Sequence, residues 1–168
     1  KGVGKLNEKV LSGDVIDLIN LSEALHERKY ADIADQIYAR RGSVKIVFIA
    51  GPSSSGKTST SKRLALQCRI LGLNPKVIEL DNYFVDRELT PKDENGEYDF
   101  ECLGAMDLKL LWQQLNDLLA GKEVEVPRFD FKDGRKYFEG NFMQLREKDI
   151  LIMEGIHALN PAMIPDVD

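Results

Sequence analysis

The chain has 168 residues, of which 43% are hydrophobic, and carries a formal net charge of −5. This length suits one α/β core and argues against two full domains. Acidic and basic residues are interspersed, which argues against a surface that neutralises a nucleic-acid backbone. For this reason we expect no nucleic-acid partner. We find no signal peptide and no apolar run of about 18 residues, so we expect no membrane partner either. Cys68 and Cys102 show no metal-ligand or disulfide spacing, which favours a cytoplasmic protein.

Residues 1–42 differ from the rest of the chain in the spacing of their apolar residues. Apolar residues recur at helical spacing between residues 21 and 42, with Ser22 as a candidate N-cap and Gly42 as a candidate stop. We therefore predict a helical lead-in or linker over residues 1–42, ahead of a core over residues 43–168.

The core begins with a strand, a glycine-rich loop and a helix. Residues 44–50, VKIVFIA, form a nearly continuous apolar run that predicts a strand buried on both faces of a parallel sheet. Residues 51–58, GPSSSGKT, match the pattern G-x-x-x-x-G-K-[ST]. Residues 58–71 then show helical spacing, and Gly72 ends the helix before Pro75. This order is the one that a phosphate-binding loop requires.

The loop predicts a nucleotide site. Its glycines let backbone N–H groups converge on phosphate oxygens, while the lysine and the hydroxyl reach the terminal phosphate and Mg²⁺. We expect Lys57 to offset charge on the transferred group and Thr58 to ligate the metal, so ATP and Mg²⁺ are the expected cofactors. The predicted nucleotide-binding residues are Gly51, Ser53, Ser54, Ser55, Gly56, Lys57, Thr58 and Ser59.

Two further predicted strands lead into carboxylates. Residues 76–80, KVIEL, run into Asp81, and residues 149–153, DILIM, run into Glu154. Because the carboxyl ends of parallel strands meet at one edge, we expect both carboxylates beside the loop. Glu154 would hold the water shell of the metal, and Asp81 would accept a proton from an attacking hydroxyl. An aspartate after a strand is also commonly a turn or cap residue, and that alternative stays open.

The remaining segments complete the predicted fold. Residues 107–120 predict a helix with Trp112 in the core, and residues 124–140 predict an extended or loop segment broken by Pro127 and Gly134. His157 has only His26 as a fellow histidine, so we expect no histidine metal site. The fold class is α/β: a three-layer α/β/α of the P-loop NTPase type with a mostly parallel sheet, preceded by the helical segment.

From about Ser43 to Pro161, the chain resembles the uridine kinase/phosphoribulokinase family of P-loop kinases. The matching pieces, in the family's order, are GPSSSGKTST, LDNYF, GEYDFE, VPRFDF and ILIMEGIHALNP. The resemblance implies ATP- and Mg²⁺-dependent phosphoryl transfer to a hydroxyl of a nucleoside or related sugar. It implies that Asp81 activates the acceptor hydroxyl, that Asp99 contacts sugar hydroxyls, and that Phe84 and Phe129 wall the acceptor pocket.

Two departures from the family pattern qualify this expectation. The family's nucleoside kinases usually bring a tyrosine and a histidine to the base in the segment that matches RFDFKDGRK, whereas this chain has Phe129 and no histidine there. We therefore expect uridine to be a poor acceptor and Arg135 to be a candidate contact for an anionic acceptor group. The chain also stops before the family's arginine-bearing lid, so we expect a core truncated before the lid.

The alternatives are a kinase for another small metabolite or sugar phosphate, and a nucleotide-binding regulatory module without turnover. The oligomeric state stays open, a homo-oligomer included. Residues 1–42 resemble a junction from a longer multidomain bacterial protein.

Overall fold

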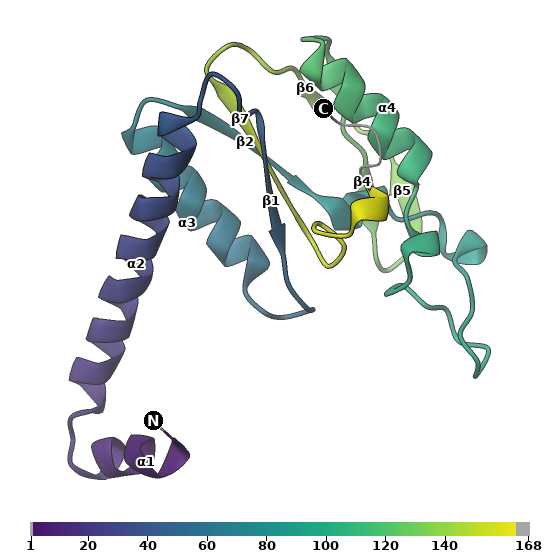
Figure 1. Cartoon of the computed structure of the whole chain (residues 1–168). Helices are drawn as coiled ribbons and strands as arrows, with labels where there is room; N and C mark the ends of the chain where they lie inside the picture. Colours follow the sequence, from purple (N-terminus) through teal and green to yellow (C-terminus); the bar gives the residue numbers. More distant parts are fainter. Residues whose placement is uncertain (1, 164–168) are drawn as a thin grey trace.

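The structure of the chain is a computed structural model that describes residues 2–163. Its centre is a sheet of three parallel strands in the order β1-β7-β2 (Figure 1). Strand β1 spans Ile46–Ala50, β2 spans Asn74–Glu79 and β7 spans Asp149–Gly155. Strand β7 therefore lies between the strand that precedes the glycine loop and the strand that precedes Asp81.

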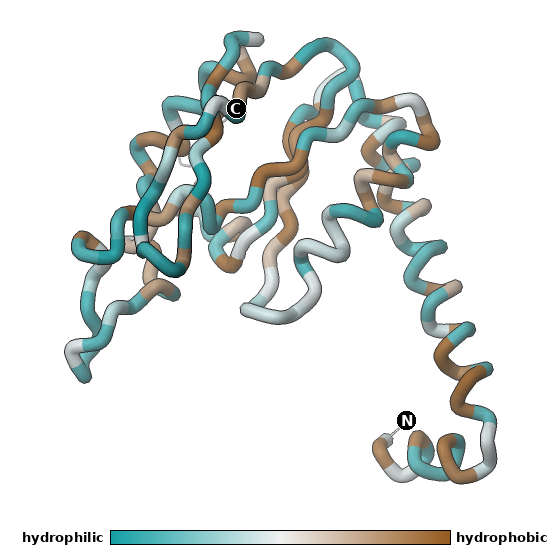
Figure 2. Tube along the Cα trace, turned by 180° about the vertical axis from the view of Figure 1, so that it is seen from behind, coloured by the Kyte–Doolittle hydropathy of each residue, from teal (hydrophilic) through white to brown (hydrophobic). Residues whose placement is uncertain are grey.

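Helices cover both faces of this sheet. Helix α3, Lys57–Ile70, and helix α4, Leu108–Leu119, lie on opposite sides of it (Figure 1). Along β7, alternate side chains enter two different hydrophobic clusters, because successive residues of a strand point to opposite faces. The predicted three-layer arrangement is confirmed, and the strands form the apolar band at the centre of Figure 2.

The two clusters assign each helix to a face of the sheet. Ile150 and Ile152 of β7 belong to the cluster that contains α3, and Leu151 and Met153 belong to the cluster that contains α4. Glu154 continues the alternation of Ile150 and Ile152, so it lies on the α3 face.

The predicted first strand is confirmed, but its burial differs from the expectation. All five residues of β1 are half-buried, whereas all seven residues of β7 are buried. Within the described residues, β1 pairs only with β7 and is an edge strand, so its other side lacks a covering neighbour. A continuous apolar run identifies a parallel strand but does not distinguish a central strand from an edge strand.

The N-terminal segment is helical, as predicted, but its helices begin elsewhere. Helix α1 spans Val3–Leu11, and helix α2 spans Val15–Ala39. Ser22 lies inside α2, where its hydroxyl donates to the Leu18 carbonyl at 2.7 Å, so the prediction of an N-cap at Ser22 is wrong. The last turns of α2 pack on α3 through the buried Ala34 and Ile37. The domain boundary at residue 43 stays a prediction.

Short elements fill the rest of the described chain. Strand β3, Val124–Glu125, pairs antiparallel with β6, Phe142–Met143, and β4, Arg128–Asp130, pairs antiparallel with β5, Arg135–Tyr137. Residues 124–140, predicted to be extended or loop, therefore hold three short strands, β3, β4 and β5, of which β4 and β5 form a hairpin. The 3-10 turns are η1, Leu80–Tyr83; η2, Arg87–Leu89; η3, Leu103–Ala105; and η4, Pro161–Met163.

Helix α4 follows its prediction closely. The Asp107 carboxylate caps it by accepting from the Leu110 N–H at 3.1 Å. Trp112 is only partly buried, and its Nε1 donates to the Met163 carbonyl at 2.5 Å. None of the helices in the described part of the chain has the length and apolarity needed to cross a membrane.

Candidate active site

The glycine loop is bent by residues with left-handed backbone conformations. Gly56 has φ 87°, and Ser54, a non-glycine residue, has φ 57°. A Cβ on Gly51 would lie 2.6 Å from Ser55 Oγ, so the loop closes tightly on itself there. Helix α3 begins directly after the loop, at Lys57. The free N–H groups at a helix start attract anions, so the loop has the architecture of a phosphate site.

A hydrogen bond joins the loop to the central strand. The Thr58 hydroxyl donates to Glu154 Oε1 at 2.5 Å, and Glu154 is only 4% exposed. A buried carboxylate is costly unless it is paired or binds a cation. A hydroxyl and one carboxylate suit Mg²⁺, which usually keeps several waters and takes its other oxygens from the phosphates. The residues present therefore fit the metal. Among the described residues, no group of three His, Cys, Asp or Glu could hold a metal without such help.

The Lys57 side chain folds back onto the glycine loop. Its ammonium donates to the Pro52 carbonyl at 2.9 Å, so the charge stays at the loop rather than extending into solvent. The remaining predicted nucleotide contacts lie where expected, in the exposed loop and the first turn of α3: Ser53, Ser54, Ser55 and Ser59. Their contacts with nucleotide stay predictions.

Asp81 lies in the turn η1, two residues past the end of β2, rather than directly at the strand end as predicted. Burial raises the pKa of this carboxyl, the negative Glu154 raises it further, and Lys57 and His157 oppose the rise. The same charges show that Asp81 lies within electrostatic reach of the loop lysine and the strand carboxylate. A carboxylate with a raised pKa is suited to accept a proton.

A close backbone approach brings η1 to β7. A Cβ on Gly155 would lie 2.7 Å from the Cβ of Leu80, so only glycine allows Leu80 this position. Leu80 directly precedes Asp81, and Gly155 directly follows Glu154. The role of Gly155 was not predicted from the sequence. The signal was a glycine at the end of a strand, which often marks such an approach.

Buried side-chain hydrogen bonds hold η1 from the other side. The Tyr83 hydroxyl donates to Gln114 Oε1 at 2.7 Å, and Gln114 Nε2 donates to the Glu125 carbonyl at 2.8 Å. Asn82 Oδ1 accepts from the Phe129 N–H at 3.1 Å. The roles of Asn82 and Gln114 were not predicted, because nothing local in a sequence shows which distant backbone group a side chain contacts.

The two aromatic residues predicted to wall the acceptor pocket lie together. The ring centroids of Phe84 and Phe129 are 5.6 Å apart, and each residue is 4% exposed. Phe131 joins this aromatic cluster, 5.1 Å from Phe129, and is 59% exposed. The role of Phe84 and Phe129 stays a prediction, but Phe131 presents the accessible ring. The alternation in RFDF, which places Phe129 and Phe131 on one strand face, was the available signal.

Asp99 and Arg135 were predicted to contact the acceptor. Asp99 Oδ1 accepts from the N–H groups of Glu101, at 2.9 Å, and Cys102, at 3.1 Å, so this oxygen caps a turn. Arg135 is exposed on β5. Their contacts with an acceptor stay predictions.

Lys136, the next residue after Arg135, has a structural role. Its ammonium pairs with Asp107, and its N–H donates to Asp86 Oδ1 at 3.0 Å. Burial opposes ionisation of Asp107, but the hydrogen bonds from Lys136 and Leu110 hold the pKa of this carboxyl below its ordinary value.

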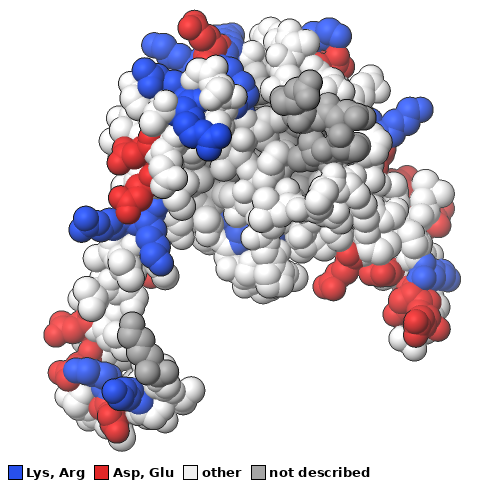
Figure 3. Space-filling model, in the orientation of Figure 1, with Lys and Arg blue, Asp and Glu red and all other residues white. Residues whose placement is uncertain are grey.

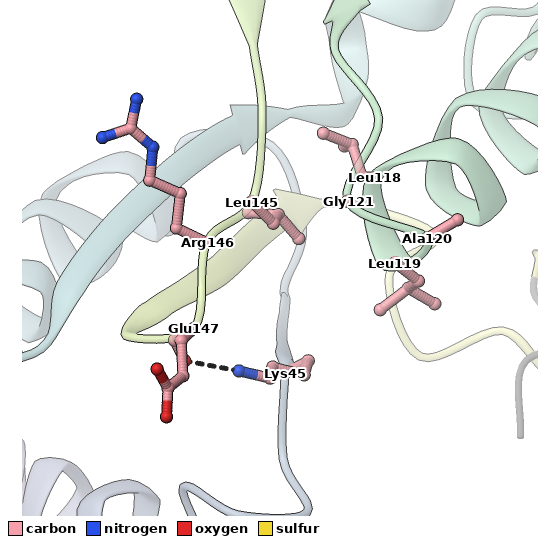
Figure 4. A pocket seen from close by; sticks show the side chains of 8 residues that line it. All are labelled: Lys45, Leu118, Leu119, Ala120, Gly121, Leu145, Arg146 and Glu147. Atoms are coloured by element: carbon pink, nitrogen blue, oxygen red, sulfur yellow. Dashed lines mark hydrogen bonds between the residues drawn. The ribbon is translucent and has the colours of Figure 1, made fainter.

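A separate hollow lies at the opposite end of the sheet. It measures about 260 Å³ and lies between the end of α4 and the residues that precede β7 (Figure 4). Lys45, which lines it, donates to the Glu147 carbonyl at 2.6 Å. Lys45 directly precedes β1, and the glycine loop directly follows the other end of β1. Five residues at about 3.3 Å each therefore separate this hollow from the phosphate site.

Comparison with known proteins identifies the family of the chain. Residues 46–167 match the model of the phosphoribulokinase / uridine kinase family. The chain is 33% identical over 122 residues to a uridine kinase of Macrococcus caseolyticus, covering 73% of this chain and 57% of that protein. It is 38% identical over 123 residues to uridine-cytidine kinase C of Dictyostelium discoideum, covering 71% and 24%.

A solved structure shows the same fold. A possible uridine kinase from Bacillus stearothermophilus matches with a TM-score of 0.68 and 24% identity, over 84% of this chain and 77% of that one. The chain spans only part of its curated relatives, about half of the Macrococcus protein. The phosphate loop, the fold and the match over residues 46–167 place the chain in the phosphoribulokinase/uridine kinase family of P-loop kinases.

Proposed function

We propose that the protein containing this chain transfers the γ-phosphoryl group of ATP, with Mg²⁺, to a hydroxyl of a neutral nucleoside or related sugar. The observation that carries this proposal is the Thr58–Glu154 hydrogen bond beside Asp81. This bond joins the hydroxyl of Thr58 in the glycine loop to the buried carboxylate of Glu154 on β7. The neighbouring strand, β2, leads into Asp81, the potential base. Phosphoryl transfer requires these parts together: a phosphate cradle, a metal position and a group that orients the acceptor.

The proposed reaction follows from these positions. Asp81 accepts the proton of the acceptor hydroxyl, whose oxygen attacks the γ-phosphorus while the bond to the bridging oxygen of ADP breaks. Lys57 offsets negative charge on the transferred group, and the N–H groups of residues 51–58 hold the phosphates. Thr58 and Glu154 would hold Mg²⁺ and its waters. When bound, this ion neutralises charge that develops on the phosphate oxygens.

Charge near the acceptor side favours a neutral acceptor over a sugar phosphate. Residues 86–101 hold seven carboxylates and two cations, a net charge of −5 that equals the formal charge of the whole chain. This loop begins just after η1 and returns beside it, since Phe100 packs on Phe84 with ring centroids 5.7 Å apart. In Figure 3, acidic side chains gather at the lower right, over the loop between β2 and α4. An acceptor that carries its own phosphate would be repelled there.

We infer that a nucleoside base would find few uncommitted polar groups in residues 128–136, which supports the expectation that uridine is a poor acceptor. Gly134 is covered by Arg87, whose Cβ lies 2.7 Å from where a side chain at Gly134 would begin. Lys136 is occupied by Asp107. The exposed Phe131 ring can stack on any base without selecting among them. Turnover measured over uridine, cytidine, adenosine, ribose and ribose 5-phosphate tests both expectations. A clear preference for uridine or for ribose 5-phosphate would contradict them.

The competing hypothesis is a regulatory module that binds nucleotide without turnover. Asp81→Asn separates the two, because the amide keeps the shape of the side chain but cannot act as a base. We expect kcat to fall by about 10²-fold or more, while ATP affinity stays within twofold. Glu79→Gln, an exposed carboxylate two residues earlier, is the matched control. Full turnover in Asp81→Asn would overturn the proposed role of Asp81, and no turnover in the wild-type protein would favour the regulatory module.

A further inference from the structure

One buried side-chain nitrogen or oxygen in the described residues has no hydrogen-bond partner: the Nε2 atom of His157. Folded proteins pair nearly all such atoms, because an unpaired buried polar atom is costly. A retained exception therefore needs an explanation, and a group that pairs only when a substrate binds is one of the few available. The proposed chemistry of Asp81, Lys57, Thr58 and Glu154 does not use His157.

The backbone places His157 at the candidate active site. It lies three residues after Glu154, in the turn that follows the central strand β7. The Asn160 N–H donates to the His157 carbonyl at 2.8 Å, which fixes this turn. Leu80 is packed against Gly155 at the start of the same turn, so His157 emerges next to η1, which carries Asp81.

The charges around Asp81 agree with this placement. Burial and Glu154 raise the pKa of Asp81, whereas Lys57 and His157 lower it. The imidazole is thus close enough to influence the carboxylate, yet no hydrogen bond joins the two side chains. His157 as a residue is half-buried, and the torsion that turns a histidine ring is soft, so rotation of the ring can bring Nε2 toward Asp81.

We propose that His157 is an acceptor-binding residue, whose Nε2 hydrogen-bonds to a hydroxyl oxygen of the acceptor that neighbours the hydroxyl bound by Asp81. This inference rests on the proposed function, because it assumes a hydroxyl-bearing acceptor at Asp81. Its consequence is that the acceptor offers at least two oxygens to the site: one that loses its proton to Asp81, and a neighbouring one for His157. Neighbouring hydroxyls are a feature of ribose and related sugars. No bond is formed or broken at the imidazole, which binds and orients only.

The test compares His157→Leu, His157→Gln and wild type in the full-length protein. Leucine removes the hydrogen bond, and glutamine keeps a donor at a similar reach. His26→Leu is the matched control, because His26 is exposed on α2. The probe is whichever of uridine, cytidine, adenosine or ribose the wild-type protein phosphorylates with the highest kcat/KM. ATP affinity and the melting temperature are measured alongside.

We expect His157→Leu to lower kcat/KM for the acceptor about tenfold, mainly through a higher KM, with ATP affinity within twofold of wild type. His157→Gln should recover most of that loss. The melting temperature of His157→Leu should equal or exceed that of wild type, because an apolar side chain replaces an unpaired buried nitrogen. A purely structural histidine would give the opposite pattern: lower stability and unchanged acceptor KM.

Three outcomes would overturn the proposal: an acceptor kcat/KM within twofold of wild type in His157→Leu, an equal loss in His157→Gln, or a parallel loss of ATP affinity. These are distinct from failure of the proposed function. If the wild-type protein phosphorylates no acceptor, both are wrong. If it turns over and His157→Leu is unaffected, only the assignment of His157 is wrong.

Discussion

The two halves of the candidate site are built in different ways. The phosphate side consists of β1, the loop over residues 51–58 and α3, which are contiguous in the sequence. The acceptor side consists of η1, residues 84–106 and the β4-β5 hairpin, which come together only through tertiary contacts. The phosphate side uses mainly backbone geometry, whereas the acceptor side depends on side-chain hydrogen bonds between distant residues. Substitutions should therefore impair nucleotide binding on the first side and turnover or stability on the second.

The phosphate side also rests on the N-terminal helix. The Tyr30 hydroxyl lies 3.4 Å from Thr60 Oγ1, and Arg63 pairs with Glu27 at 2.7 Å and with Glu23 at 3.0 Å. These pairs are largely exposed and contribute little to stability individually. The buried residues through which α2 contacts α3 lie toward its C-terminal end, while most of its first half is exposed. Figure 2 shows that this first half carries apolar segments.

The largest effect is expected on the phosphate side. Lys57→Ala would remove the proposed charge-assisted hydrogen bond to the terminal phosphate, a kind of bond that is worth about 1.5–3 kcal/mol, or roughly 10- to 100-fold in affinity. Titration of ATP by calorimetry measures the loss. Lys62→Ala removes an exposed lysine from the same helix and should leave affinity unchanged. Equal affinities of wild type and Lys57→Ala would show that another segment binds the phosphates.

The second test acts where the two sides meet. Gly155→Ala places a Cβ against the Cβ of Leu80, which cannot rotate away, so η1 and Asp81 must shift. We expect a destabilisation of about 1–3 kcal/mol and a fall in kcat that exceeds any loss of ATP affinity. Gly42→Ala is the control, since nothing lies within 4 Å of its added Cβ. Unchanged stability and kcat would mean that this approach does not position Asp81.

The third test probes the hydrogen bonds of the acceptor side. Tyr83→Phe leaves Gln114 Oε1 buried without a donor, which should cost about 1–3 kcal/mol in the free energy of unfolding. Tyr137→Phe provides a contrast, because the Tyr137 hydroxyl meets Asp133 at the surface and water can replace it. Urea unfolding of both variants measures the difference. Similar values would indicate that water reaches Gln114.

The smallest expected effect concerns pH. The folded-state pKa of Asp107 lies below its ordinary value, so its ion pair contributes stability above about pH 4 and loses it as the pH falls through the folded-state pKa. Asp107→Asn lacks this contribution. The stability difference between wild type and variant should therefore be present at pH 7 and shrink toward pH 3. Glu123→Gln, at an exposed position, controls for general charge effects. A difference that does not depend on pH would leave only the cap of α4 as the role of Asp107.

The sequence analysis identified the parts that are local. The glycine loop, the parallel strands before it and before Glu154, and helix α4 follow from patterns within about 15 residues, because turn geometry and apolar periodicity are local properties. The predicted N-cap of α2, Ser22, lies eight residues after the actual N-cap, Asp14, since Ser22 has the chemistry of a cap while the helix continues through it.

By itself, the sequence determined a phosphate-binding loop, an α/β fold and a set of carboxylates at strand ends. Only the tertiary structure decided which of these meet. The strand order puts Glu154 between the loop and Asp81, and Gly155 lets Leu80, the residue before Asp81, approach the end of β7. Tertiary packing also buried the Phe129 ring, assigned Lys136 to Asp107 and left His157 Nε2 without a partner. The physical reason is that burial and pairing depend on neighbours far away in the chain, which no local pattern records.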